Sequence, residues 1–222
     1  MNKTEHTEAL EISKRLLAEL VKFPAKSVVA AVSMRTSIGK FLAGFQGMAA
    51  DGTLGTGLAE CFRYAREAGA TLNSMARVRT LLFKEAPKFH VGFVIVNAAI
   101  IFSFIEESEI IAGLEFKSRS EVDELMDAMV LDIEEIKLNK ADSFASSDYQ
   151  AFVGLSSLLI QHLSSTERLL PRIVQYTWPV HFPSLTMSNN IYGAGDRSEE
   201  LIAENKVIHP LFMPRHVIAL SE

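Results

Sequence analysis

The longest uncharged stretch of the chain, residues 89–105, constrains the fold more than any other feature, because so much apolar surface has to be removed from water. The stretch has 17 residues, including His90 and Asn97. A helix that spans a bilayer needs roughly 17 to 25 apolar residues, so this one lies at the lower limit. We therefore expect a helix buried in a protein core, with Val94 inside that core. A membrane segment is the less favoured alternative.

Apolar residues at three- and four-residue spacing predict that the chain is mostly helical as far as Leu170. Ser118 and Glu121, and likewise Ser147 and Gln150, stand three residues apart at a helix start, as a capping box requires. The polar loop between the last two helices has the length of a helix hairpin, so we expect these helices to be antiparallel. The expected helices cover residues 5–22, 27–48, 58–83, 89–114, 118–138 and 147–166.

The pattern changes after Pro171. Residues 172–178 are rich in β-branched and aromatic side chains, and residues 217–220 form a second short run, so both predict strands. Residues 183–192 and 198–205 predict two short helices between the strands. The expected order is therefore strand, helix, helix, strand.

These elements predict a mainly α fold with two domains, a helical domain over residues 1–170 and a small α+β domain over residues 171–222. Hydrophobic residues make up 48% of the chain and charged residues 22%, which is typical of soluble globular proteins and not of disordered chains. The N-terminus lacks the apolar segment and cleavage site of a secretory signal, so we expect a protein made and kept in the cytoplasm.

The charge of the chain argues against a general nucleic-acid binder, because the net charge is -5 and phosphate binding needs a basic surface. Two blocks nevertheless differ in sign. Residues 63–88 hold six basic and two acidic side chains, whereas residues 106–148 hold four basic and thirteen acidic ones. Two interpretations stay open: solvated helix faces, or complementary patches between neighbouring subunits of an assembly.

Residues that could carry chemistry are few. Cys61 is the only cysteine, and none of the six histidines pairs at the spacing of a zinc motif. The Gly-rich segment 51–57 lacks the Gly-Lys-Ser/Thr ending of a phosphate loop and predicts a turn. The sequence has no Gly-x-Ser-x-Gly motif, and neighbouring acids diverge on a helix, so they cannot flank one bond. We expect no enzymatic activity, no metal and no cofactor.

The C-terminal quarter carries several distinctive motifs: Leu170-Pro171-Arg172, Pro183-Ser184-Leu185, Ile191-Tyr192-Gly193, Glu199-Glu200-Leu201-Ile202 and Ile208-His209-Pro210. With these motifs the segment resembles the end of phage Mu-type DNA circulation proteins, which are tail components. The resemblance extends more weakly upstream to about residue 114, and the family's N-terminal β-rich domain has no counterpart here. We therefore expect a shortened relative or one part of a split system.

The same residues resemble a LysM module in the order of their elements and in the spacing from Asn205 to Pro214. LysM modules often bind N-acetylglucosamine polymers. Two loops that form the sugar groove in such members differ here, with His181-Phe182-Pro183 in place of Gly-Asp-Thr and Arg215 in place of a glycine. Tail proteins also use LysM-like domains as adhesive parts between structural subunits.

These resemblances imply a structural component of a tail baseplate or hub, which docks to hub, tube or wedge proteins in multiple copies. They place the protein in the virion tail, and in the host cytoplasm during assembly. The alternatives are a DNA-end-binding protein carried in the tail and a peptidoglycan-binding module. The residues expected to dock come from the two altered loops: His181, Phe182, Pro183, His209, Phe212 and Arg215.

Overall fold

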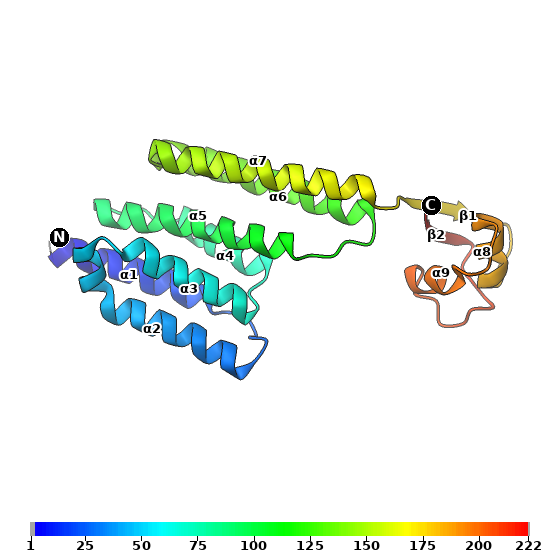
Figure 1. Ribbon diagram of the computed structural model, residues 1–222, viewed down its shortest axis with the longest axis horizontal. Helices are drawn as coiled ribbons and strands as arrows, with labels where there is room; N and C mark the ends of the chain where they lie inside the picture. Colours follow the sequence, from blue (N-terminus) through cyan, green and yellow to red (C-terminus); the bar gives the residue numbers. More distant parts are fainter. Residues whose placement is uncertain (1–2, 222) are drawn as a thin grey trace. The chain divides into compact units, whose positions relative to one another are not determined.

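The computed structural model describes residues 3–221, apart from the side chain of residue 141. These residues form nine α-helices, one short 3-10 helix and a two-stranded sheet, so the expected mainly α fold is confirmed (Figure 1). The first helices are α1 (Lys3–Leu20), α2 (Val28–Asp51), α3 (Leu54–Ala68), α4 (Leu72–Phe83) and α5 (His90–Ala112). They are followed by α6 (Arg119–Lys140), η1 (Ala141–Ser143), α7 (Ser146–Leu169), β1 (Ile173–Thr177), α8 (Ser184–Tyr192), α9 (Ser198–Glu204) and β2 (His216–Leu220).

The chain divides into two compact units, and the division passes through the long helices α6 and α7. The first unit contains the chain up to Leu114 together with Asp132–Leu159. The second contains Glu115–Leu131 together with the chain from Ile160 onward. The boundary expected near Leu170 concerns independent folding and stays a prediction. A chain that ends at Leu170 tests this boundary: its circular dichroism spectrum should keep most of the helical signal.

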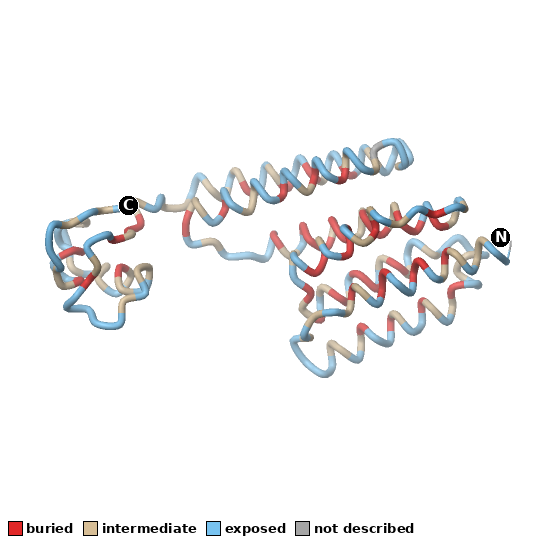
Figure 2. The backbone as a smooth tube through the Cα atoms, turned by 180° about the vertical axis from the view of Figure 1, so that it is seen from behind, coloured by how far each residue is buried: buried red, intermediate tan, exposed pale blue. Residues whose placement is uncertain are grey.

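Helix α5 lies at the centre of the first unit, where it packs against α1, α3 and α4. Its inward positions, among them Ile95, Ala99 and Phe104, are almost fully buried. Figure 2 shows buried and exposed positions interspersed along the helices. Val94 is 48% exposed, however, so the expectation that it lies in the core is wrong. Adjacent residues of a helix point in different directions, so they can differ in burial even at the centre of a bundle and in a wholly apolar sequence.

Two helices are long and apolar enough to cross a membrane by length and composition alone, α5 and α2. In α5 half of the apolar window is buried inside the protein, which fits the core helix that the sequence predicts. In α2 only 17% of the window is buried. Its outward side carries small residues such as Gly39 and Ala43 and the exposed Val28 and Val32.

The single helix expected over residues 58–83 is instead two helices, α3 and α4. Gly69 stops α3 in the left-handed conformation with φ of 107°, which a residue with a side chain rarely adopts. Thr71 then starts α4 through a capping box with Ser74, in which each side chain bonds the other residue's backbone N–H. The break was readable from the Gly-Ala-Thr sequence at residues 69–71.

The two capping boxes expected at the starts of α6 and α7 do not form. Glu121 accepts a hydrogen bond from the backbone N–H of Lys117, at 2.8 Å, and the buried hydroxyl of Ser118 has no partner. Helix α7 begins at Ser146, two residues earlier than a capping box with Ser147 as its N-cap requires. Ser147 therefore lies inside the first turn, where its hydroxyl donates to Asp148 and cannot cap.

We call residues 171–221 the C-terminal module. Its strands pair antiparallel, with Ile173 opposite Leu220 and Thr177 opposite His216, and α8 and α9 lie between them in the chain. The order strand, helix, helix, strand is the one that the sequence predicts. Tyr176 and Trp178 pack against a small core whose buried members are Met187, Leu201, Met213, Val217 and Ala219.

Candidate docking surface of the C-terminal module

Two loops of the module, the one before α8 and the one before β2, lie side by side and are joined by backbone hydrogen bonds. Ser184 N–H donates to Pro210 O at 2.8 Å, and Met213 N–H donates to Phe182 O at 3.2 Å. The Nδ1 of His181 bonds Met213 O at 2.8 Å, which requires that this nitrogen carry the proton. The sequence expectation placed the docking residues on these two loops, and the fold brings the loops together.

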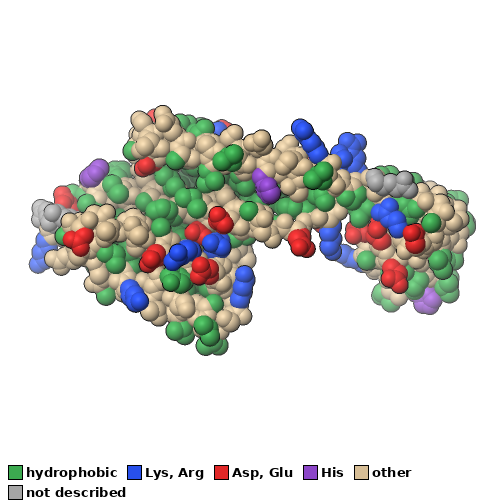
Figure 3. Space-filling view, in the orientation of Figure 1, with side chains coloured by type: hydrophobic (Ala, Val, Ile, Leu, Met, Phe, Trp, Pro, Cys, Tyr) green, Lys and Arg blue, Asp and Glu red, His purple; other side chains and the backbone are tan. Residues whose placement is uncertain are grey.

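Large apolar side chains on and beside these loops face solvent. Ile208 is fully exposed, Phe212 is 68% exposed and Leu211 is 57% exposed. Val180, before α8, is 52% exposed, and Leu185, in its first turn, is 62% exposed. Hydrophobic side chains are accordingly prominent on the module in Figure 3. Large apolar side chains in solvent are typical of surfaces that contact other molecules, so these residues are candidates for such a surface.

The predicted docking residues divide into two kinds. Phe212 and His209 point outward, with their rings 5.4 Å apart. Phe182 is half-buried and packs edge-on against Trp178, with ring centroids 5.6 Å apart, next to the module core. Pro183 is the half-buried residue that precedes α8.

His181 and Arg215 are exposed, but both also tie the loops together. His181 bonds the backbone of Met213, as described above, and Arg215 Nε donates to Trp178 O at 3.2 Å. The backbone of Arg215 in turn accepts from the N–H of Trp178 at 2.8 Å. These two side chains thus hold the two loops together, whereas Phe212 is 68% exposed.

Sequence reasoning named Ile208 and Leu185 only within the resemblance motifs and Leu211 only as part of the loop before β2, and it did not name Val180. Ile208 and Leu211 stand on either side of His209-Pro210, and Val180 follows Pro179. Apolar residues next to prolines in short loops cannot join a regular element and are too few to form a core of their own. That combination was the available signal for an exposed contact residue.

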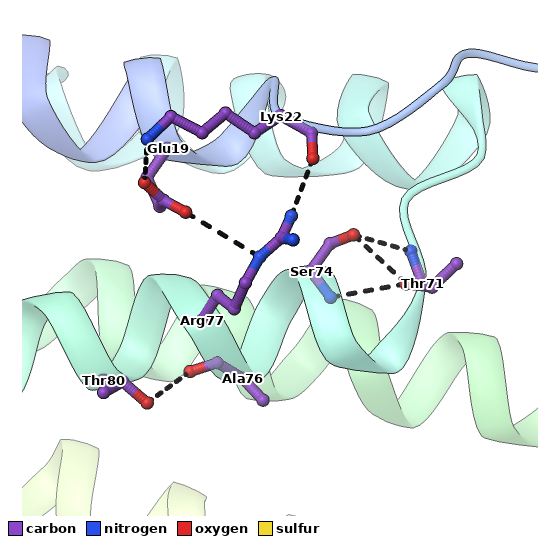
Figure 4. Close-up of polar contacts among 7 residues, drawn as sticks. All are labelled: Glu19, Lys22, Thr71, Ser74, Ala76, Arg77 and Thr80. Carbon is purple, nitrogen blue, oxygen red and sulfur yellow. Dashed lines mark hydrogen bonds and ion pairs between the residues drawn. The ribbon is translucent and has the colours of Figure 1, made fainter.

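The basic block of residues 63–88 is largely neutralised inside the first unit. Arg66 pairs with Glu106 of α5. Arg77 donates from Nη2 to Lys22 O at 2.7 Å and lies 3.7 Å from Glu19, which ties α4 to the end of α1 (Figure 4). Figure 3 shows acidic and basic side chains next to one another on this unit. The block therefore does not form a positively charged surface that is free to bind phosphates.

A buried ion cluster joins three helices of the first unit. Arg79 of α4 is 2% exposed and bonds both Glu107 of α5, also 2% exposed, and Asp132 of α6. Burial raises the pKa of Glu107 to about 7, although the guanidinium of Arg79 opposes this rise. Such a cluster favours one arrangement of the three helices, because a buried charge is stable only beside its partner.

Other reactive groups are equally confined. Cys61 is fully buried, its sulfur lies 3.8 Å from Ser37 Oγ, and burial raises the pKa of the thiol to about 11. The thiol is therefore protonated near neutral pH and out of reach of a substrate. Within residues 3–221, no three His, Cys, Asp or Glu side chains lie close enough together to hold a metal ion.

No protein-family model matches the chain, and no curated protein matches it.

Proposed function

We propose that the protein is a structural component of a phage or phage-like tail, in the baseplate or hub, and docks to neighbouring tail proteins through a LysM-like C-terminal module. It acts without catalysis, in multiple copies, and joins the tail in the host cytoplasm. The observation that carries the proposal is the apolar surface formed by Ile208, Leu211 and Phe212 on a loop that is pinned to the rest of the module.

The arrangement supports docking because the exposed side chains do not depend on a mobile loop. The loop before β2 is held to the loop before α8 by the bonds at Pro210 and Met213, so little conformational entropy is lost when a partner covers it. Interface energy concentrates in a few aromatic and aliphatic anchors at the centre of such patches. Phe212, flanked by His209 and Leu211, has that character.

The two alternative functions receive less support. A DNA-end-binding protein needs free cations, and Arg66, Arg77 and Arg79 are paired within the first unit. A glycan-binding module would use aromatic rings in its groove. Here the rings of Trp178 and Phe182 pack on each other and on the module core, so neither is free to stack on a sugar.

The experiment is to introduce Ile208→Ser and Phe212→Ser together and to measure the amount of the protein in purified tail particles. Loss of an interface anchor costs about 2 kcal/mol or more, which is about 30-fold in affinity, so the variant should be depleted from particles. The matched control is Leu138→Ser, because Leu138 is 85% exposed and lies on α6, outside the module. Wild-type amounts of the double variant in infectious particles would contradict the proposal.

Two further measurements separate the alternatives. The glycan-binding function would be favoured if the wild type binds cell-wall fragments and the double variant loses this binding but is still incorporated into tail particles. Binding to linear DNA that weakens steeply as salt is raised would favour the DNA-binding function.

A further inference from the structure

The two outer edges of the module's sheet differ. In the antiparallel pair, Trp178 N–H donates to Arg215 O at 2.8 Å and Ser221 N–H donates to Arg172 O at 2.7 Å, which fixes the alternation of the ladder. The backbone groups of Ile173, Gln175 and Thr177 therefore point away from β2. Those of His216, Ile218 and Leu220 point away from β1 in the same manner.

The β2 edge is closed by a side chain. The amide of Asn205 accepts from Ile218 N–H at 2.8 Å and donates to Ile218 O at 2.7 Å. These are the two bonds that a further strand would make at that position. Lys206, which follows Asn205, has a φ of 50°, a conformation that turns the chain sharply away after α9.

The β1 edge is open. Ile173, Gln175 and Thr177 are all exposed, and in the described structure their backbone N–H groups donate to no other group. Natural proteins blunt open edges with charges, prolines or bulges. Strand β1, Ile-Val-Gln-Tyr-Thr, has none of these within it, and four of its five residues are β-branched or aromatic types that favour strands. An edge of this kind binds another strand.

We propose that β1 pairs antiparallel with β1 of a second copy of this chain, with Gln175 opposite Gln175 and Ile173 opposite Thr177. In this register the outward backbone groups of each copy meet those of the other, and each such pair exchanges two N–H···O bonds. The two modules then share one four-stranded sheet, and the pairing is two-fold symmetric.

Charge favours a second copy as the occupant. The strand is neutral, so self-pairing brings no like charges together along its length. The flanking cation, Arg172, would lie opposite Trp178 of the second copy and not opposite another cation, so the pairing brings no like charges together at its ends either. The pairing does not use Ile208 or Phe212. A chain that dimerises through β1 and is still absent from tail particles would support this inference and contradict the proposed function.

Cross-linking through introduced cysteines tests the register. Opposed residues in a hydrogen-bonded antiparallel pair have Cα atoms about 5.5 Å apart, within the range of about 4.4 to 6.8 Å that a disulfide bridges. The native Cys61 is fully buried, so cross-links report on the introduced residue. Under mild oxidation Gln175→Cys should double the mass from 24.6 kDa. The exposed control Thr186→Cys, on α8, should remain at the monomer mass.

A mixed experiment sharpens this test. Ile173→Cys alone and Thr177→Cys alone should form no disulfide-linked dimers, and their mixture should form them, because these two positions oppose one another only across the two-fold axis. Equal cross-linking of Thr186→Cys, or a mixture that cross-links no better than the single variants, would overturn the proposed register.

Light scattering over a concentration series tests the dimer without cysteines. The wild type and Gln175→Ala should show twice the monomer mass. Gln175→Pro should be monomeric with an unchanged melting temperature, since proline is tolerated where a strand's N–H faces solvent. The proposal is overturned by a wild type that stays monomeric at every concentration or pairs only with a strand of a different protein. If Gln175→Pro fails to fold, the cross-linking pattern of the cysteine variants decides whether the proposed pairing is correct.

Discussion

The first unit and the C-terminal module place their charged and apolar groups in opposite ways. The first unit buries an ion cluster around Arg79 and pairs most of the cations near it, so its polar groups find partners within the chain. The module has a small apolar core and leaves Ile208 and Phe212 in solvent. The difference fits the proposed division of roles, in which polar contacts within the chain stabilise the first unit and the module offers its exposed apolar side chains to a partner.

The largest expected effect is on the ion cluster. Arg79→Ala should lower the free energy of unfolding by about 3 to 5 kcal/mol, because it leaves the buried carboxylate of Glu107 without its cation. Urea denaturation followed by circular dichroism measures this loss. The matched control is Arg35→Ala on the exposed side of α2, which should change stability by less than about 0.5 kcal/mol. Similar losses in both variants would show that the cluster does not stabilise the unit.

A leucine pair inside the module tests its division into core and contact surface. Leu201 is fully buried, so Leu201→Ala should destabilise the module by about 2 to 5 kcal/mol through the cavity it leaves. Leu211 is 57% exposed, so Leu211→Ala should leave the melting curve within about 0.5 kcal/mol of wild type. Tryptophan fluorescence is a suitable probe, because Trp178 is the only tryptophan and lies beside this core. Equal losses would contradict the assignment of Leu211 to a free surface.

The pH dependence of stability tests the environment of Glu107. Its pKa rises from an ordinary 4.5 to about 7 in the folded protein, so between these values the folded state binds more protons than the unfolded state. Stability contributed by this group is therefore lost as pH rises through that window. Glu107→Gln should gain up to about 3 kcal/mol relative to wild type between about pH 5 and about pH 8. A difference that stays constant over this range would contradict the raised pKa.

The smallest expected effect is that of Val94→Asp on α5, and the adjacent Ile95 provides the contrast. Val94 is 48% exposed and Ile95 is 2% exposed. Val94→Asp should cost about 1 kcal/mol or less, because the carboxylate stays in water. Ile95→Asp should unfold the first unit, because it buries an unpaired charge. Thermal denaturation of both variants measures the contrast. Unfolding by Val94→Asp would show that this side of α5 is covered.

How far the sequence predicts the fold depends on the kind of signal. Periodicity located α5 and the strands of the module within one or two residues, since it reports a buried face directly. It could not say which face of α5 is buried, because nearly every position there is apolar, and Val94 was misplaced for that reason. The capping box at Ser118 failed because Glu121 reaches Lys117 N–H instead, a choice made by local geometry.

The candidate site was predictable in position but not in composition. The two loops follow from the order of the elements and the prolines that end them. Which side chains face outward depends on packing in three dimensions: Phe182 turns toward Trp178, while Phe212, an equally apolar residue, does not. The ion cluster of Arg79, Glu107 and Asp132 was not predictable, because its members lie far apart in the chain and match no motif.

The most direct test of the docking surface is a photo-crosslinking side chain at position 212, introduced as Phe212→p-benzoylphenylalanine in assembled tail particles. The proposal predicts that irradiation yields an adduct with another tail protein, identified by mass spectrometry, and that the same replacement of Leu138 on α6 yields none. Particles that contain the labelled protein but give no adduct at position 212, or equal adducts at both positions, would contradict it.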